Sequence, residues 1–149
     1  MKKLFILITI LLWVSCSRED MAINKYRDKM KNPLSSYGGN ADKLKAYLAI
    51  GKEIETDERL KDEQKKNALL ASCYQQAMNH AIMAELDSLS NAEKSEFIIS
   101  ICDKAIAADP SRFYLYSNRA TYHYKLGDYP QTIRDLEKAL ELSSDVRGS

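Results

Sequence analysis

Several residue types are scarce in this chain of 149 residues, and each scarcity removes a class of structure or function. Five Gly and three Pro are too few for a turn-rich sheet protein, so the composition favours helix. Two His and three Cys offer little material for a catalytic or metal-binding site. A net charge of +1 gives no reason to expect a nucleic-acid partner. What remains has the length of one globular domain with a single core.

Long apolar runs are also absent, with one exception at the amino terminus. Met1-Lys2-Lys3 is positively charged, and the residues from Leu4 to Val14 are apolar apart from Thr9. As a helix this run would cover about 16 Å, whereas the hydrocarbon core of a membrane is about 30 Å thick. The layout therefore predicts a signal peptide over residues 1–15 rather than a stable membrane span.

Small residues come directly before the first cysteine, in the order Trp13-Val14-Ser15-Cys16. This motif resembles the lipobox of bacterial lipoproteins. The resemblance implies cleavage before Cys16 and lipidation of its thiol. The lipid would then anchor the protein to a membrane. Secretion without a lipid is the alternative.

The next residues, Ser17-Arg18-Glu19-Asp20, place acidic groups beside the cysteine. They resemble the export signal of Bacteroidetes surface lipoproteins, which implies an outer membrane lipoprotein exposed at the cell surface. Retention on the periplasmic face is the alternative. Residues 16–40 carry few large apolar groups and several turn formers, so they predict a lipidated tether, within which a short helix over 22–30 is possible.

From residue 41 onward the apolar residues recur at helical spacing. The pattern predicts helices over about 41–54, 62–86 and 91–109. Ser90 and Glu93 have the spacing of a capping box, which marks the start of the third helix, and Pro110 ends it.

The last third of the sequence combines bulky, small and turn-forming residues. These are Tyr116 and Ala120 in a first helix, Gly127 and Tyr129 in a turn, and Leu136 and Ala139 in the core of a second helix. Gly127 can end a helix, Asp128 can cap the next one, and Pro130 fits its first turn. The pattern over residues 113–146 resembles a tetratricopeptide repeat. It implies an all-α domain over 41–149, a short α-solenoid of antiparallel hairpins, with the preceding hairpin lengthened by about two turns per arm.

In that family, residues of the first helix that point into a groove bind a protein or peptide partner. The resemblance implies such contacts at the matching positions of this sequence: Tyr114, Ser117, Asn118, Thr121 and Lys125.

Few residues are candidates for catalysis or metal binding. Cys73, His80 and Cys102 lack the paired short spacings of a zinc site, so we expect no metal, no cofactor and no enzymatic activity. Cys73 and Cys102 lie on apolar helix faces, where a disulfide and two buried free thiols are both compatible with the pattern.

The final helix has an apolar side with nothing after it to cover it. Ile133, Leu140 and Leu142 would be partly bare unless the helix bends over the core, a homodimer forms through the C-terminal helix, or another protein docks. A truncated version of a longer repeat protein would also explain this side.

Together these features predict a lipid-anchored envelope protein that acts as a protein–protein interaction module. Two alternatives have the same anchor. One is an immunity or self-protection lipoprotein that blocks a toxin. The other is an accessory glycan-uptake lipoprotein, which the single Trp, inside the signal peptide, does not favour.

Overall fold

The structure is a computed structural model that describes residues 18–31 and 38–147. Residues 18–31 are helical. The helices that follow are α2 (Asn40–Thr56), α3 (Glu63–Met83), α4 (Asn91–Ala108), α5 (Phe113–Lys125) and α6 (Tyr129–Arg147). All regular secondary structure in these ranges is α-helical, which confirms the predicted fold class.

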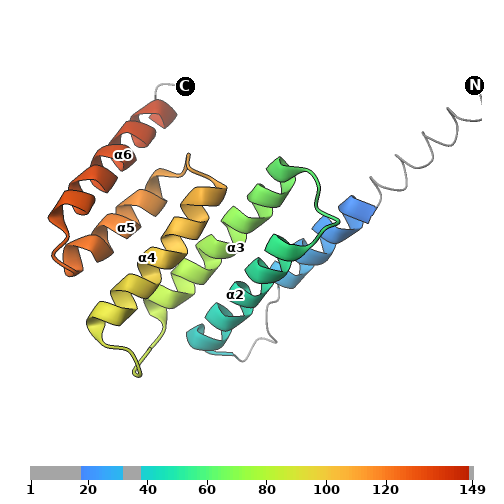
Figure 1. Cartoon of the computed structure of the whole chain (residues 1–149), viewed down its shortest axis with the longest axis horizontal. Coiled ribbons are helices and arrows are strands. Elements are labelled where there is room, and N and C mark those ends of the chain that lie inside the picture. The colour runs from blue at the N-terminus through green and yellow to red at the C-terminus, as the bar shows by residue number, and fades with distance from the viewer. Residues whose placement is uncertain (1–17, 32–37, 148–149) are drawn as a thin grey trace, which may run out of the picture.

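The helices lie side by side in one row, and each packs against its neighbours in the chain (Figure 1). Successive helices run in opposite directions, so the molecule is a short stack of helical hairpins of tetratricopeptide type. The α3–α4 hairpin has arms of 21 and 18 residues, against 13 residues in α5. Helix α3 exceeds α5 by eight residues, about two turns, which confirms the lengthening of the first arm, whereas α4 is no longer than α6 with its 19 residues.

The helix ends follow the local signals of the sequence. Ser90 Oγ accepts a hydrogen bond from the amide of Glu93 at 3.2 Å, and Glu93 Oε2 accepts from the amide of Ser90 at 2.8 Å. This confirms the capping box at the start of α4. Gly127 has a φ of 77°, the left-handed conformation that separates α5 from α6. Asp128 Oδ1 accepts from the amide of Gln131 at 3.2 Å, as expected of a helix cap.

The core runs along the row, where the inner faces of neighbouring helices meet. Its largest fully buried side chains come from every helix up to α5: Tyr26, Ile54, Cys73, Met78, Ile98, Ile101, Cys102 and Leu115. Helix α2 approaches α3 closely at Gly51, where an added Cβ would lie 2.8 Å from Cζ of Tyr74. The absence of a side chain at this position permits the packing.

The prediction of a tether over residues 16–40 is wrong for residues 18–31. They form a helix longer than the short one over 22–30, and Ala22, Ile23 and Tyr26 are buried in the core. The physical reason is their spacing, which puts all three on one side of a helix that packs on the rest of the stack. The compact part of the chain therefore includes residues before position 41.

The side of helix α6 that is buried differs from the predicted one. Ala139 is buried as expected, but Leu136, predicted to lie in the core, has 51% of its surface exposed. Thr132, Asp135 and Ala139 face inward instead. Asp135 accepts two hydrogen bonds from the guanidinium of Arg119 on α5, at 2.9 and 2.6 Å. A buried ion pair and small side chains attach α6, so its large apolar residues point outward.

No helix among residues 18–31 and 38–147 combines the length and the apolar composition that a membrane span requires.

Candidate functional site

A groove opens on one side of the molecule. Its first part lies between the helix of residues 18–31 and α3. Farther along, α3 meets α5, where Tyr114 donates a hydrogen bond to Gln75 Oε1 at 2.7 Å and Arg112 donates to the same oxygen at 2.7 Å. The cavity is formed by residues 18–31 and α3, and these two hydrogen bonds join α5 to the same helix farther along.

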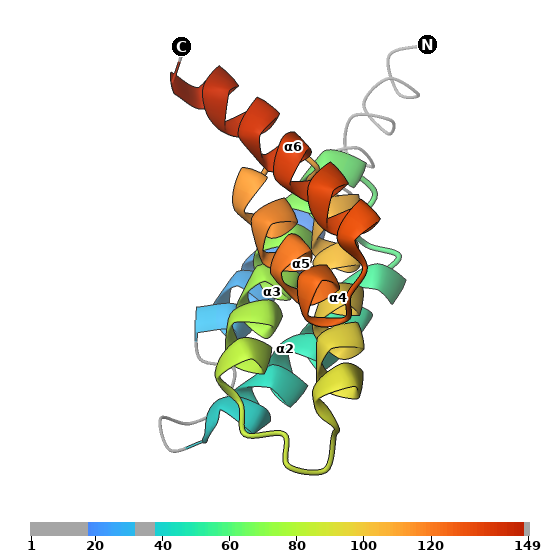
Figure 2. The ribbon, with the colours of Figure 1, turned by 90° about the vertical axis from the view of Figure 1, so that its left-hand side faces the viewer.

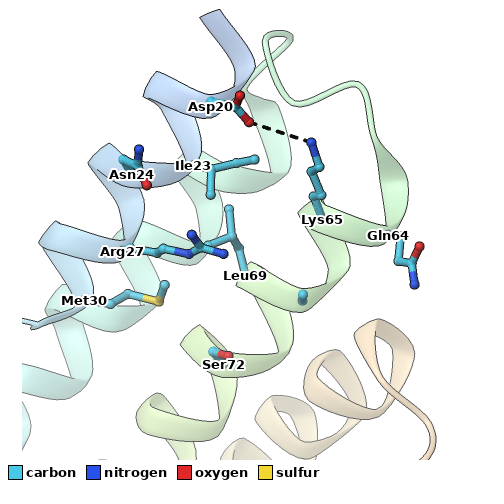
Figure 3. A pocket seen from close by; sticks show the side chains of 10 residues that line it. Asp20, Ile23, Asn24, Arg27, Met30, Gln64, Lys65, Leu69 and Ser72 are labelled. Carbon is cyan, nitrogen blue, oxygen red and sulfur yellow. Dashed lines mark ion pairs between the residues drawn. The ribbon is translucent and has the colours of Figure 1, made fainter. Parts of the chain in front are cut away.

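The first part of the groove encloses a cavity of about 650 Å³. Ile23, Met30 and Leu69 give it an apolar floor, while Asn24, Gln64 and Ser72 supply amide and hydroxyl groups at its sides (Figure 3). A mixture of apolar surface and a few polar groups is typical of a site that holds a small molecule or a short peptide segment.

Two cations border this cavity, and they differ in what they contact. Lys65 lies 3.7 Å from a carboxylate oxygen of Asp20 and 4.0 Å from one of Glu19. The guanidinium of Arg27 reaches across the cavity toward Leu69 (Figure 3) and has neither a hydrogen bond nor an ion pair within the described part of the chain. Arg27 is thus available to an anionic group that enters the groove.

The α5 residues predicted to bind a partner are brought to one side of that helix. Tyr114, Asn118, Thr121 and Lys125 follow at intervals of four, three and four, with Ser117 beside them. Their polar groups are mostly engaged inside the protein: Asn118 Nδ2 donates to the carbonyl of Tyr114 at 2.9 Å, and the hydroxyls of Ser117 and Thr121 donate to carbonyls one turn earlier. Tyr114 is tied to Gln75. These positions therefore hold less free hydrogen-bonding capacity than Arg27.

Lys125 lies at a second cavity of about 650 Å³, away from the first. Ile82, Asn91, Lys94 and Tyr122 also line it. The ammonium group of Lys125 stands 4.3 Å from the ring centroid of Tyr122, and that of Lys94 donates to the carbonyl of Ala84 at 2.8 Å. Both cations of this cavity are already engaged.

Cys73 and Cys102 are part of the packed core. Cys73 and Cys102 are free and buried, so the disulfide that the sequence left open is not formed. Cys73 Sγ donates to the carbonyl of Tyr47 at 3.0 Å, and Cys102 Sγ lies 3.4 Å from the sulfur of Met78. Burial raises the pKa of both thiols to about 12, which keeps them protonated and unreactive. The described residues contain no cluster of three potential metal ligands.

Sequence reasoning missed the first part of the groove, because residues 18–31 were assigned to a tether. Ala22, Ile23, Tyr26 and Met30 show helical spacing, and that signal could have placed Arg27 at the border of the apolar side, one turn from both Ile23 and Met30. The α3 residues at the cavity, Lys65, Ala68, Leu69 and Ser72, fall on one face of that helix, which is a second available signal.

Residues that resemble an export signal also take part in the fold. Glu19 Oε1 accepts from the amides of Lys61 and Asp62, at 3.0 and 2.7 Å, just before α3 begins. Asp20 lies beside Lys65. Cys16 and Ser17, like the expected signal peptide, lie outside the described residues.

These features define a class of protein, a stack of tetratricopeptide-type hairpins with a groove along one side. The chain is 33% identical over 96 residues to "Tetratricopeptide repeat protein 36" of Homo sapiens, an alignment that covers 64% of this chain and 48% of the human protein. It is 35% identical over 73 residues to "Protein SGT1 homolog" of Oryza sativa subsp. japonica, covering 46% of this chain and 20% of the rice protein.

The chain thus spans about half of the human relative and a fifth of the rice one. No family model matches it, and no solved structure matches it. The similarity supports the same type of repeat that residues 113–146 resemble, and with it a role in protein–protein interaction.

Proposed function

We propose that this protein is a lipid-anchored envelope protein that binds a partner protein in the groove between residues 18–31 and α3. The observation that carries the proposal is the unengaged guanidinium of Arg27 above an apolar floor. An unpaired cation at a partly apolar cavity fits a ligand that brings both a carboxylate and an apolar side chain. A peptide segment with an acidic residue has both groups.

Different residues of the groove can bind different parts of the ligand. Arg27 would form a two-pronged hydrogen-bonded pair with the carboxylate of the ligand. Asn24, Gln64 and Ser72 can bond its main chain, and the floor of Ile23, Met30 and Leu69 can receive an apolar side chain. On α5, Asn118 Oδ1 is a further contact for a longer segment.

The experiment compares charge reversals at two exposed cations. A library of displayed unstructured peptides is selected on the full chain, and the binding of the enriched peptides is then measured by fluorescence anisotropy. We expect acidic peptides to be enriched. Arg27→Glu should weaken their binding by tenfold or more, a loss that corresponds to about 1.4 kcal/mol of binding free energy. Lys45→Glu is the matched control, because Lys45 is exposed on α2 and does not line the cavity. Equal losses in both variants, or no enrichment of acidic peptides, would exclude this groove as the site.

The anchor is a separate part of the proposal. A lipid on Cys16 would sit two residues before the first described helical residue, Arg18, so the folded stack would lie close to the membrane. Growth with an alkyne-tagged fatty acid should label the wild-type chain and leave Cys16→Ala unlabelled. Loss of the protein on protease treatment of intact cells would favour surface exposure. Loss only after the outer membrane is opened would favour the periplasmic alternative.

A further inference from the structure

Helix α6 presents an apolar side that no described helix covers. Tyr129, Ile133, Leu136 and Leu140 are 58, 56, 51 and 69% exposed, and Tyr124 and Leu126 from the end of α5 extend the same surface. Tyr124 and Tyr129 are in contact, with ring centroids 5.8 Å apart. In Figure 2, α6 is the helix nearest the viewer, at the end of the row. These six residues are called the α6 face below.

The α6 face repeats a pattern that elsewhere receives another helix. Counting back 34 residues from Ile133, Leu136 and Leu140 (133 − 34, 136 − 34 and 140 − 34) leads to Ile99, Cys102 and Ile106 on α4. On α4 these positions are covered: Cys102 is fully buried, and Ile99 and Ile106 are partly buried against the core. The α6 face therefore has the residues of a helix-packing surface without its partner.

The size of the face argues for an occupant. Six large side chains that are each 36 to 69% exposed present several hundred Å² of apolar surface, a size at which a patch often has a binding function. A stable interface between two proteins buries about 800 Å² on each partner. The α6 face with its polar surroundings is large enough to form one.

The structure favours a second copy of this chain as that occupant. Tyr129, Ile133, Leu136 and Leu140 are spaced by four, three and four residues, the spacing with which apolar stripes of two helices pack against each other. Glu137 is the charge nearest to this stripe on α6, while Arg134, Lys138 and Glu141 lie farther round the helix, so two such faces bring few charges together.

Stacking of copies end to end would not cover the face. At the other end of the row, the outward side of residues 18–31 carries exposed polar residues such as Asn24, Lys25 and Asp28, with Met21 as its one strongly exposed large apolar group within the described part. An apolar face gains little against such a surface. We infer that two copies pair through their α6 faces by a two-fold axis, so that the α5–α6 hairpins of both copies form one four-helix layer.

The test is site-directed crosslinking of the full chain in detergent-solubilised membranes. Leu136→Cys places a thiol in the middle of the α6 face, and a short bismaleimide then links copies that are paired. Met83→Cys is the matched control, since Met83 is 70% exposed on α3, outside the face. The buried thiols of Cys73 and Cys102 do not compete, and the wild-type chain reports any link through Cys16.

We expect a product of twice the chain mass from Leu136→Cys at least fivefold above that from Met83→Cys or wild type. Adding Ile133→Glu should abolish it while the helical circular dichroism signal stays unchanged, because Ile133 is exposed in the single chain. Equal linkage of the two cysteine variants, no linkage, or a product containing a different protein would each overturn the inference. The result is independent of whether Arg27 binds a peptide.

Discussion

At the scale of single residues, the closest packing in the stack depends on one missing side chain. The ring of Tyr74 fills the space above Gly51, and its hydroxyl donates to Glu55 Oε1 at 2.5 Å. Lys104 Nζ lies 3.2 Å from the same carboxylate oxygen and 5.0 Å from the centroid of the Tyr74 ring. The ring is therefore held from two sides and cannot move away without breaking contacts between α2, α3 and α4.

Gly51→Ala tests this arrangement. A Cβ at this position would lie within 2.9 Å of three atoms of Tyr74, and we expect the overpacking to lower the free energy of unfolding by about 1–3 kcal/mol. The better helix propensity of Ala would offset part of this loss, by up to about 1 kcal/mol. Gly39→Ala is the control, because nothing lies within 4 Å of its added Cβ. Urea denaturation that finds Gly51→Ala as stable as wild type would contradict the close approach.

His80 makes the stability depend on pH. Its Nδ1 lies 3.0 Å from Asn40 Oδ1 and its ring stacks on Tyr47, and burial, with a smaller contribution from Lys43, lowers its pKa from 6.5. A lowered pKa in the folded state means that the unfolded chain binds the proton more readily. Stability should therefore fall as the pH drops below 6.5. Between pH 7.5 and 5.0, denaturation midpoints of wild type should decrease more than those of His80→Gln; parallel decreases would contradict this role.

At the scale of elements, the two ends of the stack were harder to predict than its middle. The capping box of α4, the stop at Pro110 and the turn at Gly127 are local signals, so the bounds of the middle helices followed from them. The spacing of Ala22, Ile23 and Tyr26 predicts a helix, but the place where this helix docks depends on long-range polar contacts that no local pattern reveals. Tyr26 donates to Asp57 Oδ2 at 2.7 Å, across 31 positions of the chain.

The prediction of which side of α6 is buried was wrong for a related reason. The resemblance to the repeat implies a core position for Leu136, and the inward side is decided instead by the pair of Arg119 and Asp135 on different helices. The candidate site shows the same limit. The α5 positions could be named from the repeat pattern, whereas Arg27 could not, because its groove exists only once residues 18–31 pack against α3.

Tyr26→Phe isolates the bond that docks the amino-terminal helix. The buried hydroxyl beside Asp57 has a pKa raised to about 12, so it remains a proton donor at neutral pH. Its removal should cost about 1–3 kcal/mol of unfolding free energy, the usual range for a hydrogen bond to a charged group. Hydrogen exchange of amides in residues 22–31 should speed up more than in α5. Tyr124→Phe, at a residue 63% exposed, should change neither quantity.

At the scale of the whole molecule, the position of Arg18 determines which end of the hairpins a lipid on Cys16 would hold. The bonds of Glu19 to the amides of Lys61 and Asp62 bring the start of the first helix to the α2–α3 connection. The α3–α4 connection lies at the opposite end of α3 (Figure 1). Helix α3 has 21 residues, so the two connections are about 32 Å apart. An anchored stack should therefore stand with its α2–α3 end toward the membrane and its groove facing sideways.

This orientation can be measured with one fluorophore at each end. Glu58 and Ser88 are exposed residues of the two connections, and a label on Glu58→Cys should be quenched by lipids that carry a quencher on the headgroup. The label on Ser88→Cys should be quenched far less, because about 32 Å of helix separates it from the anchored end. Cysteine labelling is selective since burial raises the pKa of Cys73 and Cys102 to about 12. Both signals should disappear in Cys16→Ala, where no lipid holds the protein. Equal quenching at both ends would mean that the stack lies flat on the membrane, and the groove would then be open to partners from only one direction.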